Sequence, residues 1–481
     1  MEEHAGARIN RRTFLQSAVI LLSLMMVAGI LTRILPPGEY DRVVVAGIEV
    51  VDPDSYHPVE APDYPIWRWF TAPIEVLFAA DNLTLITIIL FILFVGGAFA
   101  VLDRTGVLRG SVAGIVRRFG DRKYVLLLVI TLFFMLLGAM FGIFEEVVPL
   151  IPVMIALSLS LGWDSLVGLG MVILATNMGF SAAIANPFTV GVAQQIAGLP
   201  LFSGLGLRVV IFVTVYGVFA WFLTRYARWI DDDPARSPVY SLDQRLRHLA
   251  SGNLDTGSLP PHLGRAIRWF LVFVLLILLV LCAAPFVPGL SSMSLPIVGL
   301  LFLIGGVGAG WVSGVGGRAT AKAVGEGMAG IAPGIALILM AVSVKHIVEQ
   351  GKILDTILHA AAEPFSTANP YLAVLAAFLV VLVMEVFVPS GSAKAFLMMP
   401  ILVPLADLIG VTRQTMVLAY TFGDGFSNMM YPTNPVLLIS LGLSVASFGL
   451  WIRWTARLWL IVLLLAAVFL GVAVAIGYGP Y

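Results

Sequence analysis

The chain has little charge and almost no cysteine. Only 12% of its 481 residues are Asp, Glu, Lys or Arg, the formal net charge is zero, and Cys282 is the single cysteine. One cysteine cannot form an internal disulfide. The six histidines are scattered and have no spacing typical of a zinc site. The sequence also lacks a basic patch and a nucleotide-binding loop, so it predicts no nucleic-acid partner, no zinc site, no cofactor apart from a possible coupling ion, and no ATP-driven pump.

Hydrophobic residues are abundant instead. They make up 59% of the chain, and the mean hydropathy is +0.99. A soluble domain would not expose so much apolar surface, so we expect most of the chain to lie in a lipid bilayer. Apolar runs of about 20 residues, long enough to cross a bilayer core, lie at 13–36, 83–102, 206–224, 269–288, 294–313 and 458–477.

The basic residues predict the orientation. They concentrate in segments 8–12, 103–123, 225–268 and 453–457. The positive-inside rule places these segments in the cytoplasm, so we predict a cytoplasmic N-terminus and an external C-terminus. The acidic loop 37–81 is then external. Arg11-Arg12 could also be read as a twin-arginine export signal, but the long apolar run without a small-residue cleavage site favours a first transmembrane helix.

One stretch of the sequence occurs twice. Residues 123–199 match residues 371–447 without a gap, at a constant offset of 248. In each copy a polar segment interrupts one apolar run, and a second apolar run is interrupted before Asn-Pro. Paired interrupted segments in two halves of a membrane protein indicate the binding site of a secondary transporter. The shared residues are Pro152 and Pro400, Leu157 and Leu405, Gly162 and Gly410, and Asn186-Pro187 and Asn434-Pro435.

These patterns predict an all-α polytopic membrane protein built from two inverted repeats. The repeats are 1–228 and 266–481, joined by a cytoplasmic linker at 229–265. About nine segments span fully. Unwound backbone is tolerated at membrane depth only where it is buried in protein or lines a polar cavity, so we expect the interruptions to converge on one site. The predicted re-entrant hairpins are 123–162 and 371–410, the broken helices are 164–199 and 412–447, and the interfacial amphipathic helices that precede the hairpins are 105–119 and 353–367.

Helix ends exposed by such breaks can bind ions of either sign, because free N–H groups suit anions and free carbonyls suit cations. A coupling ion could be a proton or a sodium ion, the latter held by Thr176, Asn186, Asp424 and Asn434. The small polar residues could also serve only turns and packing. The predicted substrate-binding residues are Glu145, Glu146, Asn177, Ser181, Asn186, Ser390, Gly391, Ser392, Lys394, Asp424, Ser427, Asn428, Thr433 and Asn434.

Five charges lie in segments predicted to be in the bilayer, where a charge is costly and is usually paired or functional. Glu146 and Lys394 occupy equivalent positions of the two copies, so we predict that they pair across the repeat axis. The pair could be structural. Alternatively, the two glutamates could bind an ammonium group or a proton, and Lys394 a carboxylate. The five are Glu145, Glu146, Glu385, Lys394 and Asp424.

The interrupted segments resemble the YfcC-type branch of the C4-dicarboxylate anaerobic carrier family, within the ion-transporter superfamily. The resemblance covers nearly the whole chain. It implies a homodimer in the bacterial inner membrane that moves an amino acid, including a basic one, or a small carboxylate by an elevator mechanism. Transport would be ion-coupled or an exchange. The motifs that carry the resemblance are Phe144-Glu145-Glu146, Asn186-Pro187-Phe188, Pro389-Ser390-Gly391-Ser392 and Gly423-Asp424-Gly425-Phe426-Ser427-Asn428.

Three other functions remain open at this point. The solute could be a C4-dicarboxylate, or the protein could be a channel or a membrane-embedded enzyme. An enzyme would need a nucleophile with a base, or a metal cluster, at one membrane face, and the sequence presents neither convincingly. A channel would not need two inverted, interrupted hairpins. We therefore predict a transporter that is not an enzyme.

Overall fold

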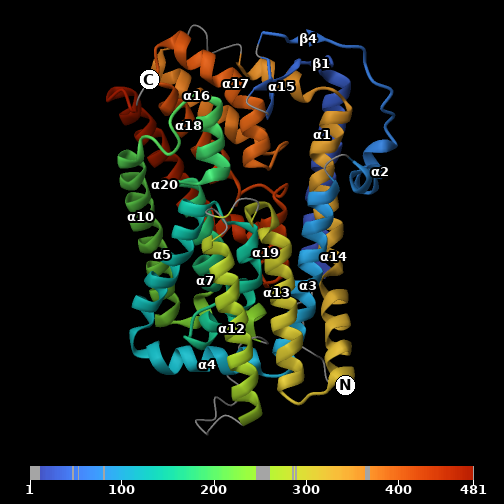
Figure 1. Cartoon of the computed structure of the whole chain (residues 1–481), viewed down its shortest axis with the longest axis vertical. Coiled ribbons are helices and arrows are strands. Elements are labelled where there is room, and N and C mark those ends of the chain that lie inside the picture. The colour runs from blue at the N-terminus through green and yellow to red at the C-terminus, as the bar shows by residue number, and fades with distance from the viewer. Residues whose placement is uncertain are drawn as a thin grey trace.

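The computed structural model describes residues 11–45, 48–52, 54–79, 82–244, 261–283, 287, 290–362 and 369–479. It is an elongated bundle of helices (Figure 1). Helix α1 (Arg11–Ile34) begins at one end, and α20 (Phe448–Ala475) leads to the C-terminus at the other end. The basic helix α4 (Val107–Phe119) lies at the end where α1 begins, whereas α15 (Leu354–Ala362) lies at the opposite end. The two helices were predicted at opposite membrane faces, and which of the two ends is cytoplasmic stays a prediction.

Five long helices pack side by side and are called the scaffold helices below. Helix α3 contacts both α13 and α14, and α12 contacts α13. Close approach depends on small residues, since a Cβ on Gly327 of α14 would lie 2.2 Å from the Gly96 carbonyl oxygen of α3. The scaffold helices are α1, α3 (Asn82–Arg104), α12 (Pro261–Ala283), α13 (Leu290–Val312) and α14 (Gly317–Gln350).

The loop after α1 contains β-structure that the sequence analysis did not predict. Strand β1 (Gly38–Glu39) pairs with β4 (His57–Pro58), and β2 (Arg42–Val45) pairs with β3 (Ile48–Val51), both antiparallel. The runs of Val and Ile in β2 and β3 favour strands. In the part of the chain that the structure describes, the fold is therefore helical except for two small ladders. Helix α2 (Arg68–Glu75) and a short 3-10 turn, Val76–Phe78, follow and lead into α3.

The loop is fastened to α15 through a buried carboxylate. The backbone N–H of Tyr40 donates to Asp355 Oδ2 at 3.0 Å, and Arg42 Nη2 lies 2.9 Å from the same oxygen. Burial, together with the negative charge of Asp355, raises the pKa of Tyr40 to about 12. Asp355 itself is 5% exposed. These contacts hold the β-ladders against the end of the molecule that carries α15.

The first repeated stretch turns back on itself and then crosses as an interrupted helix. Helix α5 (Lys123–Phe141) is followed by Gly142, whose φ of 67° suits glycine. Lys123 Nζ donates to the Leu161 carbonyl at 3.4 Å, which brings both ends of this first hairpin together. The remaining elements of the hairpin are a 3-10 turn, Glu145–Leu150, and α6 (Ile151–Ser160). The first half of the first broken helix consists of α7 (Ser165–Leu169), a π-helical segment, Gly170–Leu174, and α8 (Ala175–Ser181). After a break at 182–186, the second half consists of a π-helical segment, Pro187–Gly191, and α9 (Val192–Ile196).

The second repeated stretch has the same order of elements. Both arms of its hairpin contact α15. The glycines shared by the two stretches have a physical reason, because Gly162 and Gly410 follow the hairpins with φ of 93° and 72°. The second hairpin is α16 (Pro370–Met384) and α17 (Gly391–Ile409), and the second broken helix is α18 (Arg413–Ser427) and α19 (Pro435–Gly442).

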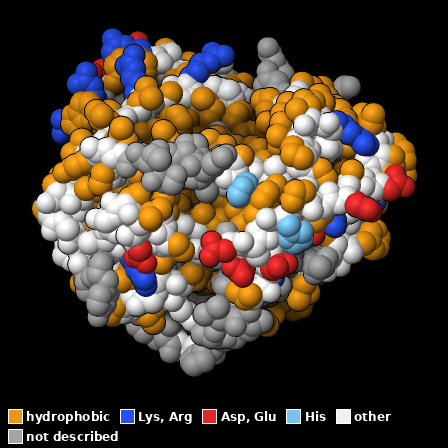
Figure 2. Space-filling view, turned by 90° about the horizontal axis from the view of Figure 1, so that it is seen from above, with side chains coloured by type: hydrophobic (Ala, Val, Ile, Leu, Met, Phe, Trp, Pro, Cys, Tyr) orange, Lys and Arg blue, Asp and Glu red, His pale blue; other side chains and the backbone are white. Residues whose placement is uncertain are grey.

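The broken helices form the centre of the molecule. Every residue from Ser165 to Ser181 is buried, as is every residue from Gln414 to Ser427. Helix α10 (Leu205–Asp232) and α20 pack outside them. Helix α20 exposes large hydrophobic side chains such as Leu460 and Leu464. Seen from the α15 end, hydrophobic side chains cover much of the rim (Figure 2), as expected for a surface in contact with lipid.

Nine helices within the described residues are long and apolar enough to cross a membrane. This set includes an arm of each hairpin, Gly110–Phe141 and Gly391–Ile409, and omits the interrupted helices. The predicted linker is only partly described. Residues 229–232 continue α10, and residues 261–265 begin α12. Residues 245–260, and residues 363–367 of the second predicted amphipathic helix, lie outside the described residues.

Candidate functional site

A buried charge cluster lies at the second hairpin. Lys394, at the start of α17, forms ion pairs with Glu385, where α16 ends, and with Asp424 of α18 at 2.9 Å. All three side chains are at most 1% exposed. The predicted pair between Lys394 and Glu146 is therefore wrong. Lys394 already has two acidic partners from its own half, so the cluster contains one more acidic than basic side chain.

Polar groups of the second broken helix extend this cluster. Asn434 Nδ2 donates to Asn428 Oδ1 at 2.7 Å, and Asn428 Nδ2 donates to the Asp424 carbonyl at 3.2 Å. The Tyr420 hydroxyl donates to the carbonyl of Gly391 at the hairpin tip. Ser427 bonds back to the Gly423 carbonyl of its own helix at 2.6 Å. These bonds fix the unwound segment between α18 and α19 beside the charged residues.

The tip of the second hairpin rests on the first broken helix. Ser392 Oγ donates to the Phe188 carbonyl at 3.0 Å. A Cβ on Gly391 would lie 2.9 Å from Thr189 Cγ2 and 3.0 Å from Asp424 Oδ2, so only glycine fits closely between the two. Residues from both halves of the chain therefore meet at this tip. Ser390, by contrast, is exposed.

The two broken helices also contact each other directly. Asn177 Nδ2 donates to the Gly425 carbonyl at 3.1 Å. Gly425 lies against Ser181, because a Cβ on Gly425 would approach Ser181 Cα to 2.4 Å. Asn177 and Gly425 are 248 residues apart, which is the offset of the repeated stretch.

The repeated Asn-Pro motifs have the same local role. Asn186 Oδ1 accepts from the N–H groups of Phe188 and Thr189, and Asn434 Oδ1 accepts from those of Val436 and Leu437. Each asparagine caps the helical segment that its proline begins. Several buried polar atoms near the breaks have no hydrogen-bond partner in the described part of the chain. They are Asn177 Oδ1, Asn186 Nδ2, Thr189 Oγ1, Glu385 Oε1 and Thr433 Oγ1.

The first hairpin tip is arranged differently. Glu146 Oε1 accepts from Ser294 Oγ of α13 at 2.6 Å, and its other oxygen accepts from the Phe144 N–H at 3.3 Å. The segment that holds Glu145 and Glu146 contacts α13 and α19. The first tip therefore contacts the second broken helix, as the second tip contacts the first one. Glu145 and Glu146 are partly exposed, and among the described residues neither acid forms an ion pair.

The residues predicted to hold sodium are distributed over the two broken helices. Asp424 and Asn434 are linked through Asn428, and Asn186 lies at the other break. The Thr176 hydroxyl donates within its own helix to the Val172 carbonyl at 2.7 Å. Ser181 likewise donates to Asn177 within α8. Within the described residues, no group of three or more His, Cys, Asp or Glu could hold a metal ion.

The predicted substrate residues omitted two buried charges. Glu385 was recognised as a charge in the bilayer but not as the partner of Lys394, nine residues further along the chain. Arg208 of α10 is 2% exposed, and its Nη1 lies 3.5 Å from the Ile184 carbonyl in the first break. Its Nη2 has no hydrogen-bond partner in the described structure. The signal for Arg208 was its position inside the apolar run 206–224.

Long apolar helices around a buried, polar and charged centre define a multi-pass membrane protein, and its relatives place it among the transport proteins. Residues 14–475 match the C4-dicarboxylate anaerobic carrier (DcuC) family, and the chain belongs to this family. The predicted family is thus confirmed.

Two relatives are similar over most of the chain. The Escherichia coli (strain K12) protein named "Putative basic amino acid antiporter YfcC" is 30% identical, with 96% of each chain covered. An uncharacterised protein of Haemophilus influenzae is 27% identical over 81% of this chain and 76% of its own. The YfcC match agrees with the predicted branch of the family.

Two solved transporter structures show a weaker similarity. The YdaH transporter of Alcanivorax borkumensis is 20% identical, covering 98% of this chain and 100% of its own, with a TM-score of 0.42. MtrF of Neisseria gonorrhoeae is 18% identical, covering 96% and 95%, also with a TM-score of 0.42. Scores at this level support no inference about this chain.

Proposed function

We propose that this protein is a secondary active transporter of an amino acid with a basic side chain, working by ion coupling or exchange across the bacterial inner membrane. The observation that carries the proposal is the meeting of interrupted segments from both halves. The tip of the second hairpin lies on the first broken helix, and Asn177 joins the two broken helices. Buried polar atoms of the broken helices and the second hairpin have no hydrogen-bond partner among the described residues, as expected of a site that exchanges partners with a solute.

The charges favour a solute that carries a positive group. Two acids, Glu385 and Asp424, contact the single base Lys394, so the cluster has one net negative charge whenever both acids are ionised. A buried excess charge is costly, and an ammonium group or a proton would remove it. The helix N-terminus at Gly391, which no side chain caps, supplies the partial positive charge that suits a carboxylate. A C4-dicarboxylate would add two negative charges beside the excess, so we regard it as the weaker candidate.

The name of the YfcC relative supports a basic amino acid as the solute. Proton or sodium coupling remains compatible with the same cluster, since either cation would balance its charge. Antiport between two solutes would need no coupling ion.

Inverted repeats and an elevator movement are part of the same proposal. At the offset of 248, α12 corresponds to α1, and the C-terminal part of α14 corresponds to α3. Helix α13 corresponds to residues 42–64, which form the β-ladder loop. One additional helix before the second hairpin would reverse its direction through the membrane. The contact between the equivalent residues Asn177 and Gly425 also supports a pseudo-two-fold relation. We expect hairpins and broken helices to move together against the scaffold helices, within a homodimer.

Counterflow in proteoliposomes tests the transport function. Vesicles loaded with unlabelled L-arginine should transiently accumulate labelled L-arginine, because the outward gradient of the unlabelled solute drives exchange through a carrier. Labelled succinate should accumulate much less in succinate-loaded vesicles. Empty liposomes and the Asp424→Asn variant are the controls. Strong succinate counterflow with none for L-arginine would favour a C4-dicarboxylate as the solute. Flux without counterflow for any solute would indicate a channel.

A further inference from the structure

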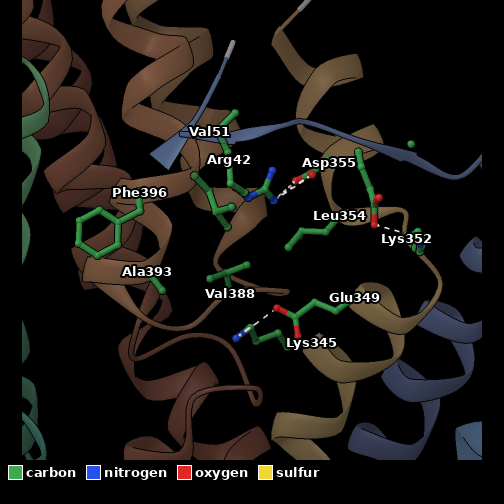
Figure 3. Close-up of a pocket in the computed structure, with 13 residues that line it drawn as sticks. Arg42, Val51, Lys345, Glu349, Lys352, Leu354, Asp355, Val388, Ala393 and Phe396 are labelled. Carbon is green, nitrogen blue, oxygen red and sulfur yellow. Dashed lines mark hydrogen bonds and ion pairs between the residues drawn. The ribbon is translucent and has the colours of Figure 1, made fainter. Parts of the chain in front are cut away.

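A separate cavity lies between the second hairpin and the scaffold helices, near the α15 end (Figure 3). Its volume is about 490 Å³, within the range of about 300–1,000 Å³ that is usual for ligand sites. It includes none of the predicted substrate-binding residues. The lining residues come from the β-ladder loop, from the ends of α14 and α15, and from the second hairpin.

The two walls of the cavity have opposite character. On the wall formed by the end of α14 and the β-ladder loop, Lys345 lies 3.2 Å from Glu349, and Lys352 lies 3.2 Å from Glu39. These side chains are 24–43% exposed, so the pairs are weak and can exchange partners with a charged ligand. The hairpin wall is apolar and is made by Val388, Ala393, Phe396 and Leu397.

The second hairpin separates this cavity from the buried charge cluster. Ala393 lines the cavity, while the next residue, Lys394, is completely buried against Glu385 and Asp424. Val388 also lines the cavity, just before the tip residues Pro389 to Ser392. A solute in the cavity would therefore be one chain thickness away from the proposed transport site.

We propose that this cavity is a second binding site for a small zwitterion, an ammonium compound that also carries an acidic group. The inference rests on the proposed transport function. The solute would occupy this cavity before it passes the second hairpin. Glu349 and Glu39 would receive the ammonium group, and Lys345 and Lys352 the acidic group. The apolar part of the ligand would lie on Phe396 and Leu397. The Lys345–Glu349 pair and the Lys352–Glu39 pair each offer one acid and one base, which matches a zwitterion better than an ion of one sign.

This chemistry has two sources at a membrane surface, a free amino acid and the headgroup of phosphatidylethanolamine. The first arm of the experiment measures equilibrium binding of labelled L-arginine to the full-length protein in lipid-free detergent. Two sites per protomer are expected in the wild type and one in Lys345→Gln/Glu349→Gln, because that change removes the charged partners but preserves the net charge. The concentration that half-saturates uptake from this side should rise at least about tenfold.

A matched control is available at the far end of α14. Arg104 and Glu326 form a similarly exposed pair at 3.5 Å, and Arg104→Gln/Glu326→Gln should keep both sites. If the first double variant does not fold, Lys352→Gln/Glu39→Gln replaces it. In the second arm, nanodiscs with phosphatidylethanolamine are compared with nanodiscs of phosphatidylglycerol. Loss of the second L-arginine site only in phosphatidylethanolamine would support the zwitterion site with a lipid as its occupant.

Two results would overturn the inference. One is a single wild-type binding site in detergent together with normal counterflow, which would leave the proposed transport function intact. The other is an unchanged second site in both double variants. Absence of L-arginine counterflow in the wild type would instead refute the proposed function itself.

Discussion

The two hairpin tips occupy equivalent positions in the repeated stretch, yet their charged side chains have partners of different kinds. At the second tip, Lys394 is fully buried and held by two acids of the same half. At the first tip, Glu146 is partly exposed and bonds to a neutral serine of the scaffold helix α13. Equivalent position in a repeat thus does not imply mutual contact. A buried lysine needs its counter-ion within a few ångströms, whereas the partly exposed carboxylate of Glu146 is held by hydrogen bonds.

The largest effect should follow from removing Lys394. Lys394→Gln leaves Glu385 and Asp424 without a cation in a buried site, and we expect a loss of about 3–5 kcal/mol in stability. Thermal unfolding monitored by fluorescence size-exclusion chromatography would show little folded protein. The triple variant Glu385→Gln/Lys394→Gln/Asp424→Asn removes all three charges of the cluster. It should recover the fold but not transport.

The comparison of tips makes a further prediction about rescue. Adding Glu146→Gln to Lys394→Gln should not restore folding, because the two side chains are not partners. Recovery in that double variant would contradict the ion pairs described here and restore the pairing predicted from the sequence.

The next largest effect should come from the contact between the broken helices. A Cβ on Gly425 would lie 2.4 Å from Ser181 Cα, so Gly425→Ala must displace backbone. We expect a cost of about 1–3 kcal/mol and reduced counterflow. Gly471→Ala on α20, where a Cβ meets open space, is the control and should behave like the wild type. A Gly425→Ala protein with unchanged melting would show that this contact is loose.

Removing either asparagine helix cap should lower stability by a smaller amount, and the two losses should differ. Asn186→Ala and Asn434→Ala each remove a cap, at a cost of about 1 kcal/mol. Asn434→Ala should cost more, because Asn434 also donates to Asn428 at 2.7 Å, while Asn186 Nδ2 has no partner in the described structure. Melting temperatures of the two variants, with Asn428→Ala as a reference, would test this order.

The smallest effect is expected at the first tip. Glu146→Gln keeps an oxygen that can accept from Ser294, so the fold should change by less than about 1 kcal/mol. Destabilisation as large as that of Lys394→Gln would remove the contrast between the two tips. Melting measured beside Ser294→Ala would show whether the single hydrogen bond accounts for the change.

Much of the architecture follows from local properties of the sequence. Apolar runs predicted the long helices, and the repeated Gly, Pro and Asn predicted where helices end, because left-handed glycines and capping asparagines act through neighbouring residues. Gly162, Gly410 and both Asn-Pro motifs have these roles. The breaks at 182–186 and 428–434 lie within or beside the predicted polar segments. The β-ladders were missed because short strands gain their stability from pairing and from contacts such as that of Tyr40 with Asp355.

Only the tertiary structure decided which charges meet. The sequence placed Glu146, Glu385 and Asp424 in the predicted bilayer segments, and the symmetry of the repeat suggested Glu146 as the partner of Lys394. The choice depends on how α16 and α18 place their carboxylates around Nζ, since Coulomb energy in a buried site depends on distances of a few ångströms. The same reason applies to Arg208, whose position beside the first break arises from the packing of α10. Sequence periodicity carries no information on such distances between remote segments.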